Sequence, residues 1–500
     1  MRYLICLPLL LSLLLVGCQP ATSPAATIIP ATTIPTSTSM DTRLTLKPCE
    51  VRGLSGYIKA ECGYLHVPED RSHPNGRTLD LKVVVVPARN SDHEPDPLFY
   101  ITGGPGGVAT DPGLVDVATT WFRAVNATRD IIFLDQRGTN DKHKLTCEPI
   151  PDEVENGTQQ QMNDWMKECL SRLSGDPRFY TTAEAMRDLD AARGALGYDK
   201  INLYGGSYGA AAVQVYMRTF PEHVRTAVLD HGTALDQLFF QALPRASQSA
   251  LDQVFAYCEQ DEKCHAAYSD IRGDWKAVLA RLAKGPVVTN YTPPGTTTPD
   301  QVSMNDLADA VHYLLTNSGG YAQIPSLIHI LAANEDWTSI VKSFNEQHSN
   351  NSQPEGPLLM LNVIYCFEPA WGDLPDEVSR LNPDSYYRDL EVKYAQLQQK
   401  ICAALPKPDS SLIYGPGKPA PLSALMLNSL IDPQNPPANM ELALKEFTRS
   451  RMVVEPTEGH STSDSACRWG IVAQYIQQGS VDGLDISCLA KQKPSFVTEN

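Results

Sequence analysis

Residues 201–212 contain the pattern that most restricts how this chain can fold. An apolar run ends at Gly205 and a helix-forming run begins after Gly209, and the sequence between them reads Gly-x-Ser-x-Gly. A serine at such a strand–turn–helix junction is held in a strained turn, and the two glycines let the strand and helix approach without Cβ clashes. Ordinary glycine-rich turns can show the same five letters. The pattern therefore predicts a nucleophile at Ser207 if an acid and a histidine follow in suitable places.

Strand-like and helical segments alternate around this turn. A helix is expected at 181–196, and the pattern of apolar residues predicts strands at Tyr57–Val67, Leu79–Val86, 97–102, 131–135 and 224–230. We expect the first two strands to form an antiparallel hairpin at a sheet edge. The alternation that follows predicts a mostly parallel sheet flanked by helices, an α/β fold.

This alternation is interrupted between residues 235 and 420. Helical patterns dominate there, at Gln241–Glu259, Trp275–Lys284, Met304–Thr316, Ile324–Asn334 and Tyr386–Leu405. The α/β alternation resumes with strands at Leu422–Leu427 and Met452–Glu455 and helices at Pro437–Phe447 and Trp469–Gln478. The sequence thus predicts a core built from residues 46–234 and 421–500, with residues 235–420 inserted as a helical cap.

The resumed core contains an acid and a histidine that could complete a catalytic triad. Asp432 follows one predicted strand and His460 follows the next, so the chain order is Ser, Asp, His. His460 would take the proton of Ser207 and return it to the leaving group, and Asp432 would orient the imidazole. Asp230 and Asp464 are the rival acids.

A glycine-rich loop, Gly103–Gly107, directly follows the strand at 97–102. A phosphate-binding loop would require a Lys and a Ser or Thr at the next helix, and neither is present. The alternatives are a plain turn and an oxyanion loop. In the second case the backbone N–H groups of Gly104 and Tyr208 would bind the oxyanion.

Asp135 and Arg137 lie two residues apart at the end of another predicted strand. We expect them to form an ion pair that braces the neighbouring loops, rather than to take part in catalysis.

The N-terminal segment has the features of an export signal. Residues 1–17 combine Arg2 with an apolar run that is too short for a comfortable membrane span. The run ends at Cys18 in a pattern that resembles the lipobox of bacterial lipoproteins, in which this cysteine is lipidated after cleavage. A plain signal peptide is the alternative. Residues 18–45 are rich in Thr, Pro, Ser and Ala and are expected to form a disordered tether.

The chain has 12 cysteines, and ten of them lie beyond Cys18. Their even number and their arrangement in neighbouring couples suggest disulfides formed in an oxidising compartment. Connectivity does not follow from sequence, and the nearest-neighbour guess is Cys49–Cys62, Cys147–Cys169, Cys258–Cys264, Cys366–Cys402 and Cys467–Cys488. Metal ligation is disfavoured because no Cys-x-x-Cys or histidine cluster accompanies them. We expect neither a metal nor a cofactor.

The net charge of the chain is −17. This acidic balance argues against nucleic acid and anionic membrane surfaces as partners. Contact with a membrane is expected only through the lipid on Cys18.

The motifs together resemble the secreted prolyl and tripeptidyl aminopeptidase family of α/β hydrolases. The segments that carry the resemblance are Gly103–Gly107, Asp135–Thr139, Asp188–Asp190, Tyr204–Gly209, Asp432–Pro433 and Gly459–His460, with Cys467 and Cys488 near the end. The resemblance implies release of N-terminal residues from peptides that have a free amino terminus. It also implies a carboxylate in the cap that binds the substrate ammonium, and Glu368 is the candidate. An esterase on the same fold and a non-catalytic binding lipoprotein remain alternatives.

Overall fold

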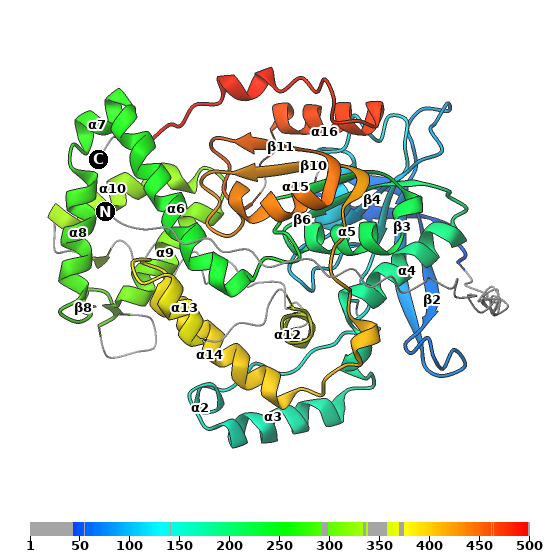
Figure 1. Cartoon of the computed structure of the whole chain (residues 1–500), viewed down its shortest axis with the longest axis horizontal. Coiled ribbons are helices and arrows are strands. Elements are labelled where there is room, and N and C mark those ends of the chain that lie inside the picture. Colours follow the sequence, from blue (N-terminus) through cyan, green and yellow to red (C-terminus); the bar gives the residue numbers. More distant parts are fainter. Residues whose placement is uncertain are drawn as a thin grey trace, which may run out of the picture. The chain divides into compact units, whose positions relative to one another are not determined.

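A central β-sheet organises the part of the chain that the structure describes (Figure 1). The computed structural model describes residues 44–498 except 55, 141, 293–298, 334–336, 339–357, 370–374, 462 and 464. Over these residues the main sheet has nine strands in the order β1-β2-β3-β5-β4-β6-β7-β10-β11. The strands are β1 (Lys47–Arg52), β2 (Tyr57–Pro68), β3 (Thr78–Val86), β4 (Leu98–Ile101), β5 (Ile131–Leu134), β6 (Ile201–Gly206), β7 (Val224–Asp230), β10 (Ala420–Ser429) and β11 (Phe447–Glu455).

Neighbouring strands are antiparallel from β1 to β5 and parallel from β5 to β11. The predicted hairpin is present as β2 and β3, but it is not the edge of the sheet, because β1 pairs outside β2. Strand β1 was missed because Val51 is the one buried side chain among its six residues. An exposed edge strand lacks the alternation of apolar residues that sequence analysis detects.

Alternate side chains of the strands enter two cores on opposite faces of the sheet. In β4, Phe99 and Ile101 pack with residues of α4 (Thr182–Ala195) and α5 (Tyr208–Thr219). Tyr100 points the other way and packs with residues of α16 (Ala466–Gln478). Both faces of the central strands are therefore apolar, which is why these strands read as continuous apolar runs in the sequence. Two further short helices connect strands of the main sheet: α1 (Pro112–Val115) lies between β4 and β5 in sequence, and α15 (Glu441–Glu446) lies between β10 and β11.

The segment between β7 and β10 is mainly helical, and we call it the insertion. Its described helices are α6 (Phe239–Gln260), α7 (Glu262–Ala267), α8 (Ile271–Leu282), α9 (Met304–Thr316), α10 (Ile324–Ala333), α12 (Leu358–Phe367), α13 (Pro375–Leu381) and α14 (Arg388–Ala404), with a small hairpin of β8 (Val287–Val288) and β9 (Gln301–Val302). Each helix predicted there is present, with ends shifted by a few residues. Helices α7, α12 and α13 were not predicted.

Two helices from the first half of the chain pack beside the insertion. Helices α2 (Asp152–Glu155) and α3 (Gln159–Arg172) lie below α14 in Figure 1, and α3 packs against α14. Lys400 of α14 donates hydrogen bonds to the carbonyls of Glu155 and Gly157, both 3.0 Å long. The insertion is thus held on one side by residues that precede β6 in sequence.

Five disulfides join cysteines that are neighbours in the sequence. The pairs are Cys49–Cys62, Cys147–Cys169, Cys258–Cys264, Cys366–Cys402 and Cys467–Cys488. The first connects β1 to β2, and the last connects α16 to the residues after it. Each bridge therefore closes a local loop and leaves the connection between distant segments to packing and hydrogen bonds.

The C-terminal residues run from α16 to the insertion, as the red trace in Figure 1 shows. The N–H of Val497 donates to the carbonyl of Ala322 at 3.1 Å, and the Tyr268 hydroxyl donates to the carbonyl of Val497 at 2.9 Å. The ring of Phe496 packs edge-on against Tyr321, with centroids 5.9 Å apart. The chain end therefore fastens the insertion to the part of the core that carries α16.

The predicted signal peptide, Cys18 and nearly all of the predicted tether lie outside the described residues. Within the described ranges, none of the helices has both the length and the apolar character needed to cross a bilayer.

Candidate active site

Ser207 occupies a strained turn between β6 and α5. Its backbone has φ 55° and ψ −123°, and it lies immediately before the first residue of the helix. A Cβ added to Gly205 would collide with the carbonyl of Gly209, and one added to Gly209 would collide with the carbonyl of Ile101 in β4. Both glycines are thus required by close backbone approach, which is the role that the sequence pattern predicted for them.

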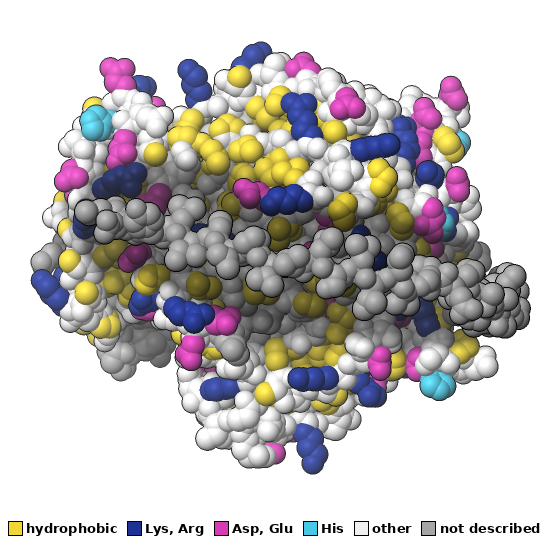
Figure 2. Space-filling model, in the orientation of Figure 1, with side chains coloured by type: hydrophobic (Ala, Val, Ile, Leu, Met, Phe, Trp, Pro, Cys, Tyr) yellow, Lys and Arg dark blue, Asp and Glu magenta, His cyan; other side chains and the backbone are white. Residues whose placement is uncertain are grey.

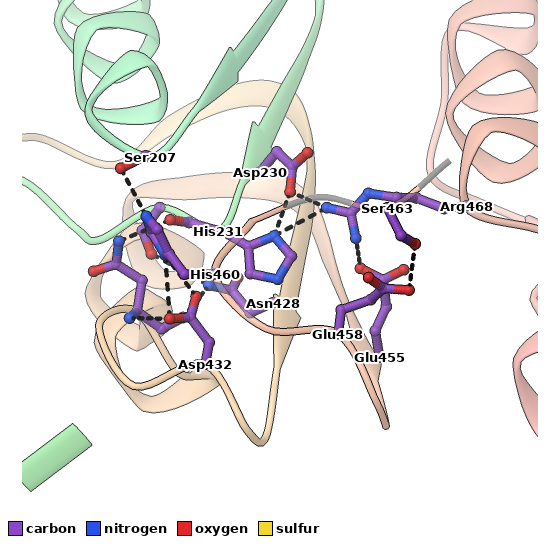
Figure 3. Close-up of polar contacts among 12 residues, drawn as sticks. Ser207, Asp230, His231, Asn428, Asp432, Glu455, Glu458, His460, Ser463 and Arg468 are labelled. Carbon is purple, nitrogen blue, oxygen red and sulfur yellow. Dashed lines mark hydrogen bonds and ion pairs between the residues drawn. The ribbon is translucent and has the colours of Figure 1, made fainter. Parts of the chain in front are cut away.

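Ser207, Asp432 and His460 follow the carboxyl ends of three parallel strands, and His460 lies within hydrogen-bonding distance of both other residues (Figure 3). The Ser207 hydroxyl is 2.9 Å from Nε2 of His460, and Nδ1 of His460 is 3.1 Å from each oxygen of the Asp432 carboxylate. The amide N–H groups of Gln434 and Asn435 also donate to Asp432, at 2.8 and 3.0 Å. These two amides fix the carboxylate, and it can therefore hold the imidazole with Nε2 facing the serine.

The electrostatic surroundings favour a charged Asp432 and a basic His460. Burial of the fully enclosed Asp432 disfavours its charge, but His460 outweighs burial and the pKa of Asp432 lies below its ordinary value. Burial likewise favours the neutral imidazole, but Asp432 outweighs it and the pKa of His460 lies above 6.5. A histidine acts as a base only when neutral, so proton abstraction from Ser207 would weaken as the pH falls through this raised pKa.

Gly104 and Tyr208 both line a small cavity of about 30 Å³ at Ser207. Gly104 has φ +118°, a conformation that residues with a Cβ rarely adopt. Tyr208 is the first residue of α5, where backbone N–H groups have no acceptor within the helix. Both predicted oxyanion donors are therefore beside the serine.

The segment Asp135–Arg137 supports this site, but not through the expected ion pair. Arg137 is fully buried and forms two hydrogen bonds with the carboxylate of Asp188 on α4, at 2.7 and 2.8 Å. Asp135 instead accepts hydrogen bonds from the backbone and hydroxyl of Thr110, at 2.9 and 3.0 Å. The expected ion pair was wrong because Arg137 binds α4, whereas Asp135 binds the segment that follows the glycine-rich loop.

Gln136, between these two residues, was not predicted to have a role. Its Nε2 donates to the Tyr208 hydroxyl at 3.0 Å, and the Thr182 hydroxyl lies 2.7 Å from the same oxygen. These contacts fix the ring of the residue that follows the nucleophile. The sequence could have indicated this role, since Gln136 lies inside Asp135–Thr139, one of the segments that carry the family resemblance.

Asp230, the first rival acid, takes part in a different network. Its carboxylate pairs with Arg468 and accepts from the Tyr204 hydroxyl and from Nδ1 of His231, the last at 2.7 Å. Arg468 also pairs with Glu455. Figure 3 shows this network on the far side of His231 from the triad. Asp464, the second rival, lies outside the described residues.

A larger cavity of about 480 Å³ adjoins the small one, since Phe239, Tyr365 and Gln434 line both. Among the described residues that line it, the charged side chains are Glu148, Glu155 and Glu391, with no lysine or arginine. Aromatic side chains make up much of the remaining wall: Trp165, Phe239, Phe240, Tyr365, Tyr387 and Tyr394. The cavity is therefore suited to a ligand that combines apolar groups with a positive charge.

Glu391 is the buried carboxylate of this cavity, with 1% of its surface exposed. Burial and the Glu391 charge raise the pKa values of Tyr365 and Tyr387, so both phenols remain neutral. Glu391 was not predicted, although Tyr387, Glu391 and Tyr394 follow one another at the spacing of one helix face.

Glu368, the predicted ligand for the substrate ammonium, lies just beyond α12 and lines neither of these two cavities. Its carboxylate accepts the backbone N–H of Thr182 at 2.8 Å, at the start of α4. Burial raises the pKa of Glu368 to about 7. Glu368 therefore links the insertion to the core, and a part in substrate binding stays a prediction.

The chain is similar to two family models and to several known proteins. Residues 96–268 match a family model described as "alpha/beta hydrolase fold", and residues 390–488 match one described as "TAP-like protein". The tripeptidyl aminopeptidase of Streptomyces lividans is 24% identical over 477 residues, which cover 87% of this chain and 84% of that protein. Serine protease Hip1 of Mycobacterium tuberculosis is 29% identical over 224 residues, 41% of this chain and 42% of that protein. A crystal structure of proline iminopeptidase from Mycobacterium smegmatis covers 83% of this chain and 98% of its own, at 12% identity and a TM-score of 0.33.

The strand order, the parallel half of the sheet and the family models together define the chain as an α/β hydrolase. Within that class it is a serine hydrolase, and it is similar to the tripeptidyl aminopeptidase and the serine protease named above.

Proposed function

We propose that this chain is an extracytoplasmic serine aminopeptidase that releases N-terminal residues from peptides. The observation that carries the proposal is the contact of Ser207, His460 and Asp432 beside a cavity lined by carboxylates and aromatic rings. The relatives named above support the reaction class, since tripeptidyl aminopeptidases and serine proteases are among them.

The proposed reaction proceeds through an acyl-enzyme. Ser207 attacks the scissile carbonyl while His460 takes its proton, and His460 then gives that proton to the departing amine. Asp432 holds the imidazole and stabilises its charged form. The amides of Gly104 and Tyr208 would bind the oxyanion, and one such donor contributes about 3 kcal/mol to transition-state stabilisation. Water, activated by the same histidine, releases the product.

We propose that the free amino terminus of the substrate is bound in the larger cavity and that Glu391 is its carboxylate partner. Of the three carboxylates that line the cavity, Glu148 is exposed and Glu155 is half-buried, whereas Glu391 is buried. Glu391 is buried among tyrosines, where an ammonium group gains both from the carboxylate and from the aromatic faces. Glu368 is the second candidate, because its raised pKa marks a buried carboxyl close to Tyr208.

A panel of peptide substrates tests this proposal. Unblocked mono-, di- and tripeptide chromogenic amides should be hydrolysed at least about ten-fold more efficiently than their N-acetylated forms, because acetylation removes the charge that the cavity attracts. Glu391→Gln should raise KM for unblocked substrates by about ten-fold or more and change kcat little. Equal hydrolysis of free and acetylated substrates would contradict an exopeptidase.

Two controls make the panel specific. Glu368→Gln should have the larger effect on KM if Glu368 is the partner of the ammonium, and that result would overturn the assignment to Glu391. Hydrolysis of short-chain esters far faster than of any peptide would instead favour the alternative function, an esterase.

We also propose that the protein is exported and anchored by a lipid on Cys18, with residues 1–17 as signal peptide, 18–45 as tether and 235–420 as a cap on the hydrolase core. The five disulfides support an oxidising compartment.

On the described surface visible in Figure 2, lysines and arginines are scattered among acidic side chains. This mixture gives no support for nucleic acid as a partner, and peptides are the partners that we propose.

The anchor has a direct test. Cys18→Ser should move the protein from the membrane fraction to the soluble fraction, because one residue carries the lipid. Recovery of the variant in the membrane fraction at the wild-type level would contradict the lipoprotein assignment.

A further inference from the structure

The loop that carries His460 rests on the carbonyl end of α9, a helix of the insertion. The N–H of Ser461 donates to the carbonyl of Thr316 at 2.7 Å. On the other side of His460, the Glu458 carboxylate accepts from the hydroxyl of Ser318 at 3.3 Å. The residues before and after the histidine are thus both held by residues at or just beyond the end of α9.

Gly459, directly before the histidine, is packed against the same helix end. A Cβ at this position would lie 2.5, 2.7 and 3.0 Å from the carbonyl oxygens of Leu315, Thr316 and Asn317. These are backbone atoms at the end of a helix, so they cannot move aside as a flexible side chain would. The backbone of Gly459 is not among those with positive φ. The residue is therefore glycine because of its contact with α9 and not because of its own conformation.

The loop that carries Asp432 has a similar contact with α6, another helix of the insertion. The hydroxyl of the fully buried Ser247 donates to the carbonyl of Pro433 at 3.0 Å. Its oxygen also lies 3.1 Å from Nδ1 of His312 on α9. Since the single hydroxyl proton is used by Pro433, His312 donates from Nδ1. Burial and the nearby His460 lower the pKa of His312 to about 3, which agrees with this neutral form.

We propose that the insertion positions the catalytic base and acid: the end of α9 sets the place of His460 through Gly459 and Ser461, and Ser247 of α6 sets the place of Asp432. The proposal rests on the proposed role of Ser207, His460 and Asp432. His312 lines the larger cavity and contacts Ser247, so the helices that surround the substrate are the helices that hold the triad. The insertion is then part of the catalytic machinery as well as a cover over it.

Gly459→Ala tests the contact with α9. The added methyl group would push the loop away from the helix end, and a displacement of about 1 Å in a catalytic group can cost about 10²-fold in rate. We expect kcat to fall by about 10- to 100-fold with KM changed by less than about two-fold. The acid limb of the pH profile should move to lower pH, because an imidazole displaced from Asp432 loses the interaction that raises its pKa.

Gly470→Ala is the matched control. Gly470 lies in α16, is exposed, and has no atom within 4 Å of an added Cβ. Its kcat, KM and pH profile should equal those of the wild type. A Gly459→Ala variant with wild-type kcat per active site would overturn the role of α9, and so would a lower kcat with an unmoved acid limb, since a merely structural role would not shift that limb.

A second pair of variants tests the contact with α6. Ser247→Ala removes the bond to Pro433 next to Asp432, whereas Ser385→Ala removes a similar bond of 2.7 Å to the carbonyl of Pro244 within the insertion. Both should lower stability, but Ser247→Ala alone should lower kcat, by about ten-fold. Equal kcat values for the two variants would contradict the proposal for Ser247.

The rate of labelling by a fluorophosphonate separates this inference from the proposed function, because labelling needs no peptide. If the wild type is not labelled, the proposed triad itself fails. If the wild type is labelled, slower labelling of Gly459→Ala and Ser247→Ala supports the inference, and labelling of both at the wild-type rate overturns it.

Discussion

Ser207→Ala is expected to lower kcat for peptide hydrolysis by about 10⁵-fold or more, because it removes the hydroxyl that forms the proposed acyl-enzyme. KM should change little, since the proposed contacts of the substrate ammonium lie in the larger cavity and do not involve the Ser207 hydroxyl. The turn that holds Ser207 should persist, because it is set by Gly205 and Gly209 and by the start of α5. Steady-state kinetics on an unblocked tripeptide amide measures both constants.

Labelling by a fluorophosphonate is the second readout of this variant. The wild type should be labelled at one site and Ser207→Ala at none, while a variant of an exposed serine on α3, Ser171→Ala, should behave as the wild type. Retention of peptidase activity by Ser207→Ala would refute the catalytic assignment. An unlabelled and inactive wild type would revive the alternative of a binding lipoprotein.

Arg468→Met is expected to have the largest effect on stability, lowering the free energy of unfolding by about 3–5 kcal/mol. Arg468 is fully buried and bridges Asp230 and Glu455, whose side chains are 0% and 1% exposed. Methionine preserves much of the volume but leaves two buried carboxylates without their cation. Urea denaturation at pH 7 would measure the loss. The matched control is Arg172→Met, since Arg172 pairs with Glu168 on the surface and should contribute less than about 1 kcal/mol.

The pH dependence of this variant provides an independent check. Burial opposes the charge of Asp230, but Arg468 holds its pKa at about 2, below the ordinary 3.8. A carboxyl whose pKa is lowered by folding stabilises the fold at pH values above its pKa in the unfolded chain. This stability is lost as the pH falls toward 2. Without Arg468 the pKa of Asp230 should rise, so the variant should be less destabilised at pH 5 than at pH 7. A loss of stability independent of pH would show that packing, and not charge, is what Arg468 provides.

The parts of this fold that sequence analysis predicted are those with strong local signals. The buried parallel strands were predicted because they are continuous apolar runs, and the longer helices of the insertion because apolar residues repeat along them at the helical period. Strand β1 was missed because it is mostly exposed, and α7 and α13 because they have only 6 and 7 residues. Helix α12 was missed because its sequence is an almost continuous apolar run without a helical repeat. Local signals also misled, since Asp135 and Arg137 are close in sequence but bind Thr110 and Asp188 respectively.

By itself, the sequence determined the α/β class and the order of Ser207, Asp432 and His460, each shortly after a predicted strand. That was sufficient to place them at one edge of the sheet, because parallel strands end on the same side. Only the tertiary structure decided which groups surround that edge. The partner of Arg137, the cavity that contains Glu391 and the helix end against Gly459 all join segments far apart in the chain. Such contacts depend on how the insertion packs against the core, and no periodicity along the sequence encodes that packing.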